Sequence, residues 1–203
     1  LMERLAQRGV NYIDTARGYT VSEQFLGEAM EGGQREKFVI ATKSMARTKE
    51  AMARDIDISL KNLRTDYIDL YQIHNPSMAE LEQVLAPGGA LEALMEAKAA
   101  GKIRHLGLTA HMAAVFERAL ELDWVETVMF PYNIVETQGE ALMEKCREKN
   151  VGFICMKPMA GGALEDARLA LRFIRQNENV SVVIPGMYDV REIDENLAAV
   201  EDT

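Results

Sequence analysis

The chain has 203 residues, of which 48% are hydrophobic and 27% charged, and its formal net charge at pH 7 is −9. This composition is typical of one globular domain, residues 1–203, and the negative charge argues against nucleic acid or an anionic membrane as partner. The two cysteines form neither a disulfide framework nor a complete metal site, and no apolar run approaches the roughly 20 residues of a membrane span, so we expect a cytoplasmic protein without a metal.

The chain opens on the stretch "LMERLAQRGV", which has the pattern of the last turns of a helix. Leu1 and Leu5 form an apolar stripe, and Gly9 stands where a helix stop is expected. The sequence therefore starts inside a fold, and we expect an element of that fold to precede it.

Seven short runs of apolar, β-branched or aromatic residues follow, each with the character of a strand. Between them lie helical patterns such as "TKEAMARDIDISLKNL" and "GALEALMEAKAAGK", with helix stops expected at Gly101 and Gly152. Runs that are apolar at nearly every position indicate parallel strands covered on both faces. The seven runs are 10–14, 38–42, 67–73, 103–109, 127–132, 152–157 and 180–185.

Strands and helices alternate at a period of roughly 25 to 35 residues, which predicts an α/β protein built from βα units. An open doubly wound sheet and a (β/α)8 TIM barrel both have this order. The open sheet usually carries a G-x-G-x-x-G loop after its first strand, and this sequence has none. We therefore predict a (β/α)8 TIM barrel that lacks its first strand and its C-terminal extension in this chain.

Polar residues stand at the carboxyl ends of the predicted strands, where the active sites of such barrels lie. An acid, an amine and an imidazole end three successive strands as Asp14, Lys43 and His74, and Tyr19 follows the first of them. Barrel closure brings these ends to one rim. The later strands end at Thr109, Asn133, Lys157 and Gly186.

Each of these residues also has a purely structural interpretation, which stays open. Asp14 can cap a turn, Lys43 can be a solvated strand end, His74 a hydrogen-bonded core histidine, and Tyr19 a packing residue. Because all four residues converge on one rim, a catalytic role is favoured over these structural interpretations. A lysine ammonium group beside a tyrosine hydroxyl favours the phenolate, and a carboxylate holds the lysine in place. With an imidazole nearby, a tyrosine hydroxyl in this setting can protonate a carbonyl oxygen. None of these side chains supplies a hydride, so a cofactor must do so.

At this point the sequence resembles the aldo-keto reductase family. "NYIDTARGYTVSEQFLGEAM" is similar to the family signature, and "IATK", "YIDLYQIHNP", "GKIRHLGLTAH" and "VSVVIPG" follow in the family's order. The resemblance implies a catalytic tetrad of Asp14, Tyr19, Lys43 and His74, with Tyr19 as proton donor. It also implies an enzyme that reduces an aldehyde or ketone to an alcohol with a nicotinamide cofactor, NADPH in preference to NADH.

The resemblance extends to the nicotinamide end of the cofactor. Thr109 takes the place of a serine that touches the carboxamide in relatives. Ala110, Met129 and Met156 take the places of an asparagine, a glutamine and a stacking aromatic residue. His111, which opens the loop after the same strand as Thr109, is expected to contact substrate or nicotinamide. His105 is expected to have a structural role.

The phosphate and adenine end is expected in the loops after the last two strands, where such barrels often bind phosphate. Lys157 and the backbone amides around Gly161 and Gly162 are expected to meet the pyrophosphate. Arg191 is expected at the ribose 2′-phosphate, and Gly186 in the same loop replaces a basic residue of relatives. Glu192 replaces a common arginine, and two residues match adenine contacts, Glu195 and Asn196.

Within the family, "TARGYTVSE", "LAPGGALEAL" and "MKPMAGGAL" most resemble a bacterial branch whose members often carry a C-terminal iron–sulfur module. A 4Fe–4S cluster is expected only if such a module exists outside this chain, which has no C-x-x-C cluster. Two alternatives to carbonyl reduction stay open: a nucleotide-binding regulatory barrel with little turnover, and an electron-transfer partner of that module. The oligomeric state stays open too.

Overall fold

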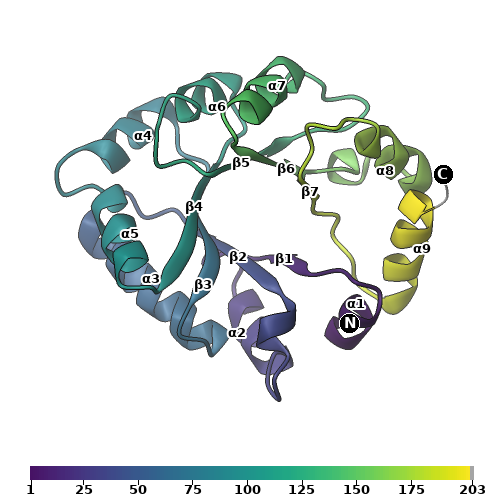
Figure 1. Ribbon diagram of the computed structural model, residues 1–203, viewed down its shortest axis with the longest axis horizontal. Coiled ribbons are helices and arrows are strands. Elements are labelled where there is room, and N and C mark those ends of the chain that lie inside the picture. The colour runs from purple at the N-terminus through teal and green to yellow at the C-terminus, as the bar shows by residue number, and fades with distance from the viewer. Residues whose placement is uncertain (202–203) are drawn as a thin grey trace.

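Seven parallel strands stand side by side in chain order and curve into an open ring in the computed structural model, which describes residues 1–201 (Figure 1). Every neighbouring pair is parallel. Each strand overlaps one of the predicted apolar runs, so the predicted α/β barrel architecture is confirmed. The strands are β1 (Tyr12–Asp14), β2 (Val39–Ser44), β3 (Ile68–Ile73), β4 (Ile103–Thr109), β5 (Thr127–Pro131), β6 (Gly152–Met156) and β7 (Val182–Val183).

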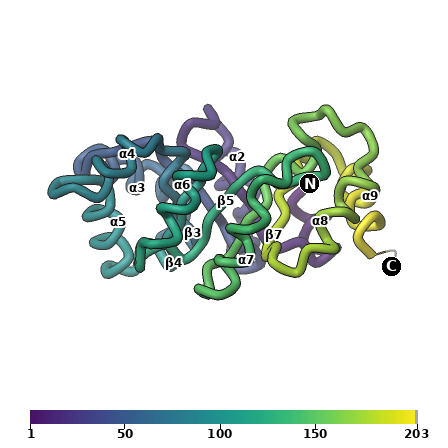
Figure 2. Tube along the Cα trace, turned by 90° about the horizontal axis from the view of Figure 1, so that it is seen from above, coloured from purple at the N-terminus to yellow at the C-terminus, as the bar shows by residue number. Residues whose placement is uncertain are grey.

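Helices surround this ring on its outer side (Figures 1 and 2). Several begin at a capping side chain: Thr48 accepts from the amide of Ala51, and Ser77 forms a reciprocal capping box with Glu80. No helix within residues 1–201 has the length and apolar character that crossing a membrane requires. The helices are α1 (Met2–Gln7), α2 (Ser22–Ala29), α3 (Lys49–Leu63), α4 (Met78–Leu85), α5 (Ala90–Ala99), α6 (Ala113–Ala119), α7 (Glu140–Glu148), α8 (Ala167–Arg175) and α9 (Val190–Glu201), with short 3-10 turns at Arg35–Lys37 and Ala160–Gly162.

One predicted helix stop is wrong. Gly101 has a φ of 77° after α5, as a left-handed helix stop requires, but Gly152 is the first residue of β6. The left-handed residue after α7 is Asn150, with a φ of 57°. Asparagine tolerates this conformation better than most residues with a side chain. Asn150 therefore ends the helix, a role that we predicted for Gly152.

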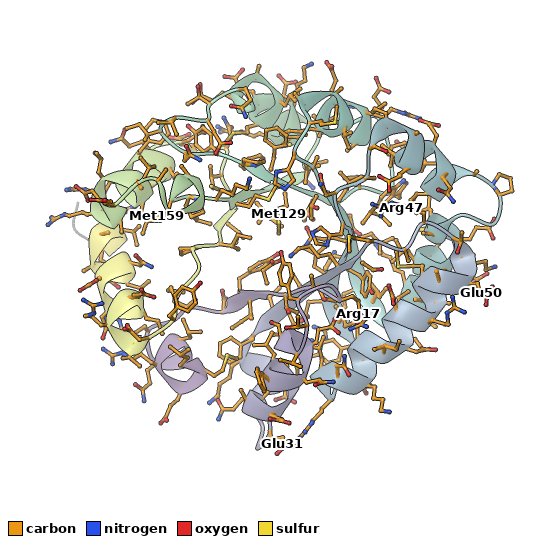
Figure 3. All side chains as sticks on the ribbon, turned by 180° about the vertical axis from the view of Figure 1, so that it is seen from behind. Arg17, Glu31, Arg47, Glu50, Met129 and Met159 are labelled. Carbon is orange, nitrogen blue, oxygen red and sulfur yellow. The ribbon has the colours of Figure 1, made fainter. Side chains whose placement is uncertain are left out.

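Side chains of the strands point alternately outwards and inwards, and this alternation places the site. The outward side chains pack against the helices and form the main core. The inward ones form a small separate cluster that contains Ala41, Leu70, Met129 and Ile154. Met129 lies in the middle of the ring of strands in Figure 3. Lys43 follows Ala41 by two residues on β2, and Asp14 ends the neighbouring β1, so both side chains lie on the same inward face.

The ring is open between β1 and β7, which do not pair with each other in the sheet. This is the position of an eighth strand in a closed (β/α)8 barrel. A cavity of about 780 Å³ lies there, lined by apolar residues of both strands and by Asp14 and Tyr19 at one end. Helices α1 and α9 lie side by side outside this opening, joined by ion pairs of Arg4 and Arg8 with Asp194 at 2.7 Å (Figures 1 and 2).

Replacing Gly27 by alanine is expected to lower the free energy of unfolding by about 2 kcal/mol or more, because overpacking of this kind costs 1–3 kcal/mol. A Cβ at Gly27 would lie 2.1 Å from the carbonyl oxygen of Asn62, so α2 and α3 would have to move apart. Urea denaturation measures the change. Gly186→Ala is the control, since a Cβ there meets no atom within 4 Å; equal midpoints for the two variants would contradict the prediction.

Candidate active site

A buried ion pair between Asp14 and Lys43 forms the floor of the site. Lys43 is only 2% exposed, and its ammonium group donates to Asp14 Oδ2 and, at 2.9 Å, to the carbonyl oxygen of Thr15. Burial raises the pKa of the Asp14 carboxyl above its ordinary value, and the Lys43 charge opposes that rise. The strand alternation holds both side chains inside the ring, so their geometry depends on the sheet itself.

Tyr19 lies above this pair, on the loop between β1 and α2. The Lys43 ammonium nitrogen is 4.9 Å from the centroid of the Tyr19 ring, and 46% of the tyrosine surface is exposed. The Tyr19 amide donates to the carbonyl oxygen of Ala16 at 3.1 Å, which closes a tight turn. The tyrosine therefore presents its ring to the lysine on one side and to solvent on the other.

His74 stands beside Tyr19 at the end of β3. The two ring centroids are 6.0 Å apart with an interplanar angle of 85°, an edge-to-face arrangement. Its amide donates to the carbonyl oxygen of Ser44, and Arg47 Nη2 donates to its carbonyl oxygen, both at 2.9 Å. Burial, followed by the charges of Lys43 and Arg47, lowers the pKa of His74 to about 4. His74 is therefore a neutral imidazole at neutral pH.

The lowered pKa of His74 predicts a specific dependence of stability on pH. Its ordinary pKa is 6.5, so the unfolded chain binds a proton between about pH 6.5 and 4 that the native protein does not. The contribution of His74 is complete above pH 6.5 and is lost as the pH falls towards 4. We expect His74→Gln to remove this part of the decline in urea-unfolding free energy between pH 7 and pH 4.5. Parallel pH profiles of wild type and variant would refute it.

Gln72 also faces this site, and the sequence interpretation missed it. It is fully buried, it pairs in register with Lys43, and it lies near Asp14. Its position two residues before His74 is the signal that would have found it, because inward positions recur at every second residue of a strand. Buried side-chain atoms without a hydrogen-bond partner gather here: Asp14 Oδ1, both amide atoms of Gln72 and His74 Nδ1.

Thr109 and His111 continue the rim after β4. Thr109 is 2% exposed, and its hydroxyl oxygen accepts from the amide of Asn75 at 2.8 Å, which ties β4 to the loop that follows His74. The hydroxyl hydrogen remains available for donation. His111 is exposed, and partial desolvation and the Lys157 charge lower its pKa. The neighbouring Ala110 is buried and offers no side-chain donor.

The loop after β6 places the next predicted residues on the same rim. Lys157 is exposed in a left-handed conformation with a φ of 54°, and Gly161 and Gly162 follow with φ values of 68° and 97°. The Gly162 amide donates to the carbonyl oxygen of Met159 at 2.8 Å, so it is engaged within the turn. The Lys157 ammonium group is the positive charge that this loop offers to an anion.

The loop after β7 and the start of α9 carry the remaining predicted residues. Gly186 and Asn196 line the cavity that also contacts Tyr19. Arg191 and Glu195 are exposed on α9 and face each other at 3.9 Å. This loop and the one after β6 both follow the carboxyl ends of strands, as the loops after Asp14, Lys43 and His74 do.

Residues 1–201 contain no group of three or more histidine, cysteine or acidic side chains placed to hold a metal ion. Both cysteines are buried, and burial raises the pKa of each thiol to about 12. His105 lies at the start of β4, away from the rim, and pairs with Glu126 at 2.7 Å. The titratable side chains that the site brings together are those of Tyr19, Lys43 and His74, with Asp14 beneath them.

Comparison with known proteins places these observations in a family. The model of the family described as "Aldo/keto reductase family" matches residues 1–169. L-galactose dehydrogenase of Arabidopsis thaliana is 27% identical over 241 residues, which cover 96% of this chain and 75% of that protein. The "Aldo-keto reductase yakc [NADP(+)]" of Schizosaccharomyces pombe is 28% identical over 82% of this chain and 53% of its own length. The solved structure of an aldo-keto reductase from Bacillus halodurans in its holo form superposes with a TM-score of 0.86 at 26% identity, covering 100% of this chain and 80% of that one.

Proposed function

This chain belongs to the aldo/keto reductase family and is an oxidoreductase, and from that premise we propose that it reduces an aldehyde or ketone to an alcohol with Tyr19 as the proton donor. The observation that carries the proposal is the position of Tyr19. Its ring lies over the buried Lys43 ammonium group and beside the neutral His74 imidazole, while nearly half of its surface is open to solvent.

The proposed chemistry follows from these three side chains. A carbonyl oxygen placed between Tyr19 and His74 accepts a hydrogen bond from each, since a neutral imidazole carries one N–H donor. As negative charge develops on that oxygen, Tyr19 gives up its proton, and the Lys43 ammonium group stabilises the phenolate that remains. Asp14 keeps the ammonium group in place and balances its charge. The nicotinamide cofactor supplies the hydride when bound.

We propose NADPH as the cofactor, and the rim residues fit its phosphate end better than its nicotinamide end. Lys157 places positive charge on the loop after β6, Arg191 places it in the first turn of α9, and the yakc relative is named for NADP(+). At the nicotinamide end Thr109 keeps a hydroxyl hydrogen to donate to a carboxamide. Two of the matching side chains, Ala110 and Met129, are buried and have no hydrogen-bonding group to offer.

The proposal is tested by incubating the protein with NADPH and a panel of aldehydes and ketones. The loss of NADPH absorbance at 340 nm measures the oxidation of the cofactor. We expect turnover with at least one class of carbonyl, and tighter binding of NADPH than of NADH by fluorescence titration. Binding of neither nucleotide would contradict the proposed cofactor site.

The replaced nicotinamide contacts support a second candidate, a nucleotide-binding regulatory barrel with little turnover. Ala110 and Met129 weaken the hold on the reactive ring without removing the positive charge of Lys157. Tight NADPH binding without reduction of any carbonyl in the panel would favour this candidate. The predicted iron–sulfur module concerns sequence other than residues 1–203 and stays a prediction.

A further inference from the structure

A buried carboxylate, Glu23, joins the elements behind the tetrad. It lies in the first turn of α2, is 2% exposed, and accepts four hydrogen bonds. Two of the donors are hydroxyl groups, that of Thr42 on β2 at 2.8 Å and that of Ser59 on α3 at 2.7 Å. The other donors are Asn62 Nδ2 at 3.2 Å and Arg17 Nη1 at 2.9 Å.

Arg17 connects this carboxylate to the loop that carries Tyr19. It stands two residues before Tyr19, and its own amide donates to the carbonyl oxygen of Lys43 at 2.9 Å. Its guanidinium group lies between Glu23 and a second carboxylate, Asp55 on α3, with Nε 3.6 Å from Asp55 Oδ1. Figure 3 shows Arg17 between the ribbons of α2 and α3.

Asp55 extends the same network to the third strand end. Its carboxylate accepts a hydrogen bond from the hydroxyl of Ser44, the residue after Lys43 on β2. The Ser44 carbonyl oxygen in turn accepts the amide of His74 at 2.9 Å. The Arg17 guanidinium group therefore contacts two carboxylates that bind the residues on either side of Lys43. One of these residues, Ser44, also accepts the hydrogen bond from the His74 amide.

We propose that Arg17 is the positioning residue of this site, which fixes the loop after β1 so that the Tyr19 ring stays between Lys43 and His74. This inference rests on the proposed role of Tyr19. Arg17 itself does not contact the tetrad side chains; it acts through the loop backbone and through Glu23 and Asp55. Without the guanidinium group the loop keeps its backbone bonds but loses the side-chain anchor that joins it to α2 and α3. Misplacement of a reacting group by about 1 Å costs roughly a hundredfold in rate.

The test compares Arg17→Gln with Arg35→Gln, a matched change at the opposite end of the strands. Arg35 is also largely enclosed and pairs with buried Asp69 at 2.7 Å, so we expect its loss to destabilise the fold without changing the rim. We expect kcat to fall about 10- to 100-fold in Arg17→Gln with an unchanged Kd for NADPH, and to stay near wild type in Arg35→Gln. Arg17→Lys keeps a charge between the carboxylates and is expected to recover part of kcat.

Hydrogen exchange of the Arg17 and Tyr19 amides gives a readout that needs no turnover. We expect about 10-fold faster exchange at these amides in Arg17→Gln than in Arg35→Gln. If Arg17→Gln does not fold, Arg17→Lys and Glu23→Gln replace it, with smaller changes in the same direction. Unchanged exchange together with equal kcat values in the Arg17 and Arg35 variants would overturn the inference. Failure of the wild type to reduce any carbonyl, with exchange changed as expected, would instead count against the proposed reaction.

Discussion

Replacing Tyr19 by phenylalanine is expected to lower kcat for carbonyl reduction about 1,000-fold, because proton donation by a positioned acid contributes factors of 10² to 10⁴. The change removes only the hydroxyl group. The ring keeps its place over Lys43 and against His74, so binding of cofactor and substrate is expected to remain within a few-fold of wild type. Steady-state kinetics with NADPH and the best carbonyl of the panel measures the loss.

Tyr67→Phe is the matched control for this change. Tyr67 immediately precedes β3, and the centroid of its ring lies 4.1 Å from the guanidinium carbon of Arg35 and 3.8 Å from that of Arg104. Removing its hydroxyl leaves the rim untouched, and kcat is expected to stay near wild type. Equal kcat values for the Tyr19 and Tyr67 variants would show that another group donates the proton.

Replacing Lys43 by methionine is expected to have the second largest effect, on both activity and stability. The positive charge that stabilises the Tyr19 phenolate disappears, so we expect kcat to fall about 1,000-fold or more. The Asp14 carboxylate then stays buried without its partner, and breaking a buried ion pair from one side costs about 3–5 kcal/mol. Urea denaturation and NADPH oxidation measure the two effects separately.

The double variant Lys43→Met with Asp14→Asn separates stability from catalysis. It removes both charges, so the free energy of unfolding is expected to return most of the way to wild type. The catalytic rate is expected to stay low because the phenolate still has no cation beside it. Recovery of kcat together with stability would mean that Lys43 serves the fold alone.

The placement of three tetrad residues was predictable because it depends on the strands. Asp14, Lys43 and His74 end three successive parallel strands, and parallel strands deliver their carboxyl ends to one rim whatever the loops do. Gln72 was missed although the same alternation places it, because a glutamine inside a strand gives no chemical signal of its own.

The contacts of Arg17, on which its proposed role depends, were not predictable from the sequence. Its partners Glu23 and Asp55 belong to different helices, and only the packing of α2 against α3 brings them to one guanidinium group. The helix stop at Asn150 was missed because glycine adopts the left-handed conformation more often than asparagine does, and Gly152 stands two residues further on. The ring of parallel strands, by contrast, was predictable, because apolar runs and helical patterns alternate along the whole sequence.

The most direct test of the proposed reaction is the fate of the hydride itself. NADPH carrying deuterium at both positions of nicotinamide C4 is incubated with the protein and a ketone, and the alcohol is analysed by mass spectrometry. We expect one deuterium at the former carbonyl carbon for each NADPH oxidised, formed about 1,000 times more slowly by Tyr19→Phe. Alcohol without deuterium, or bound NADPH that is never oxidised, would contradict the proposal that this barrel is a carbonyl reductase.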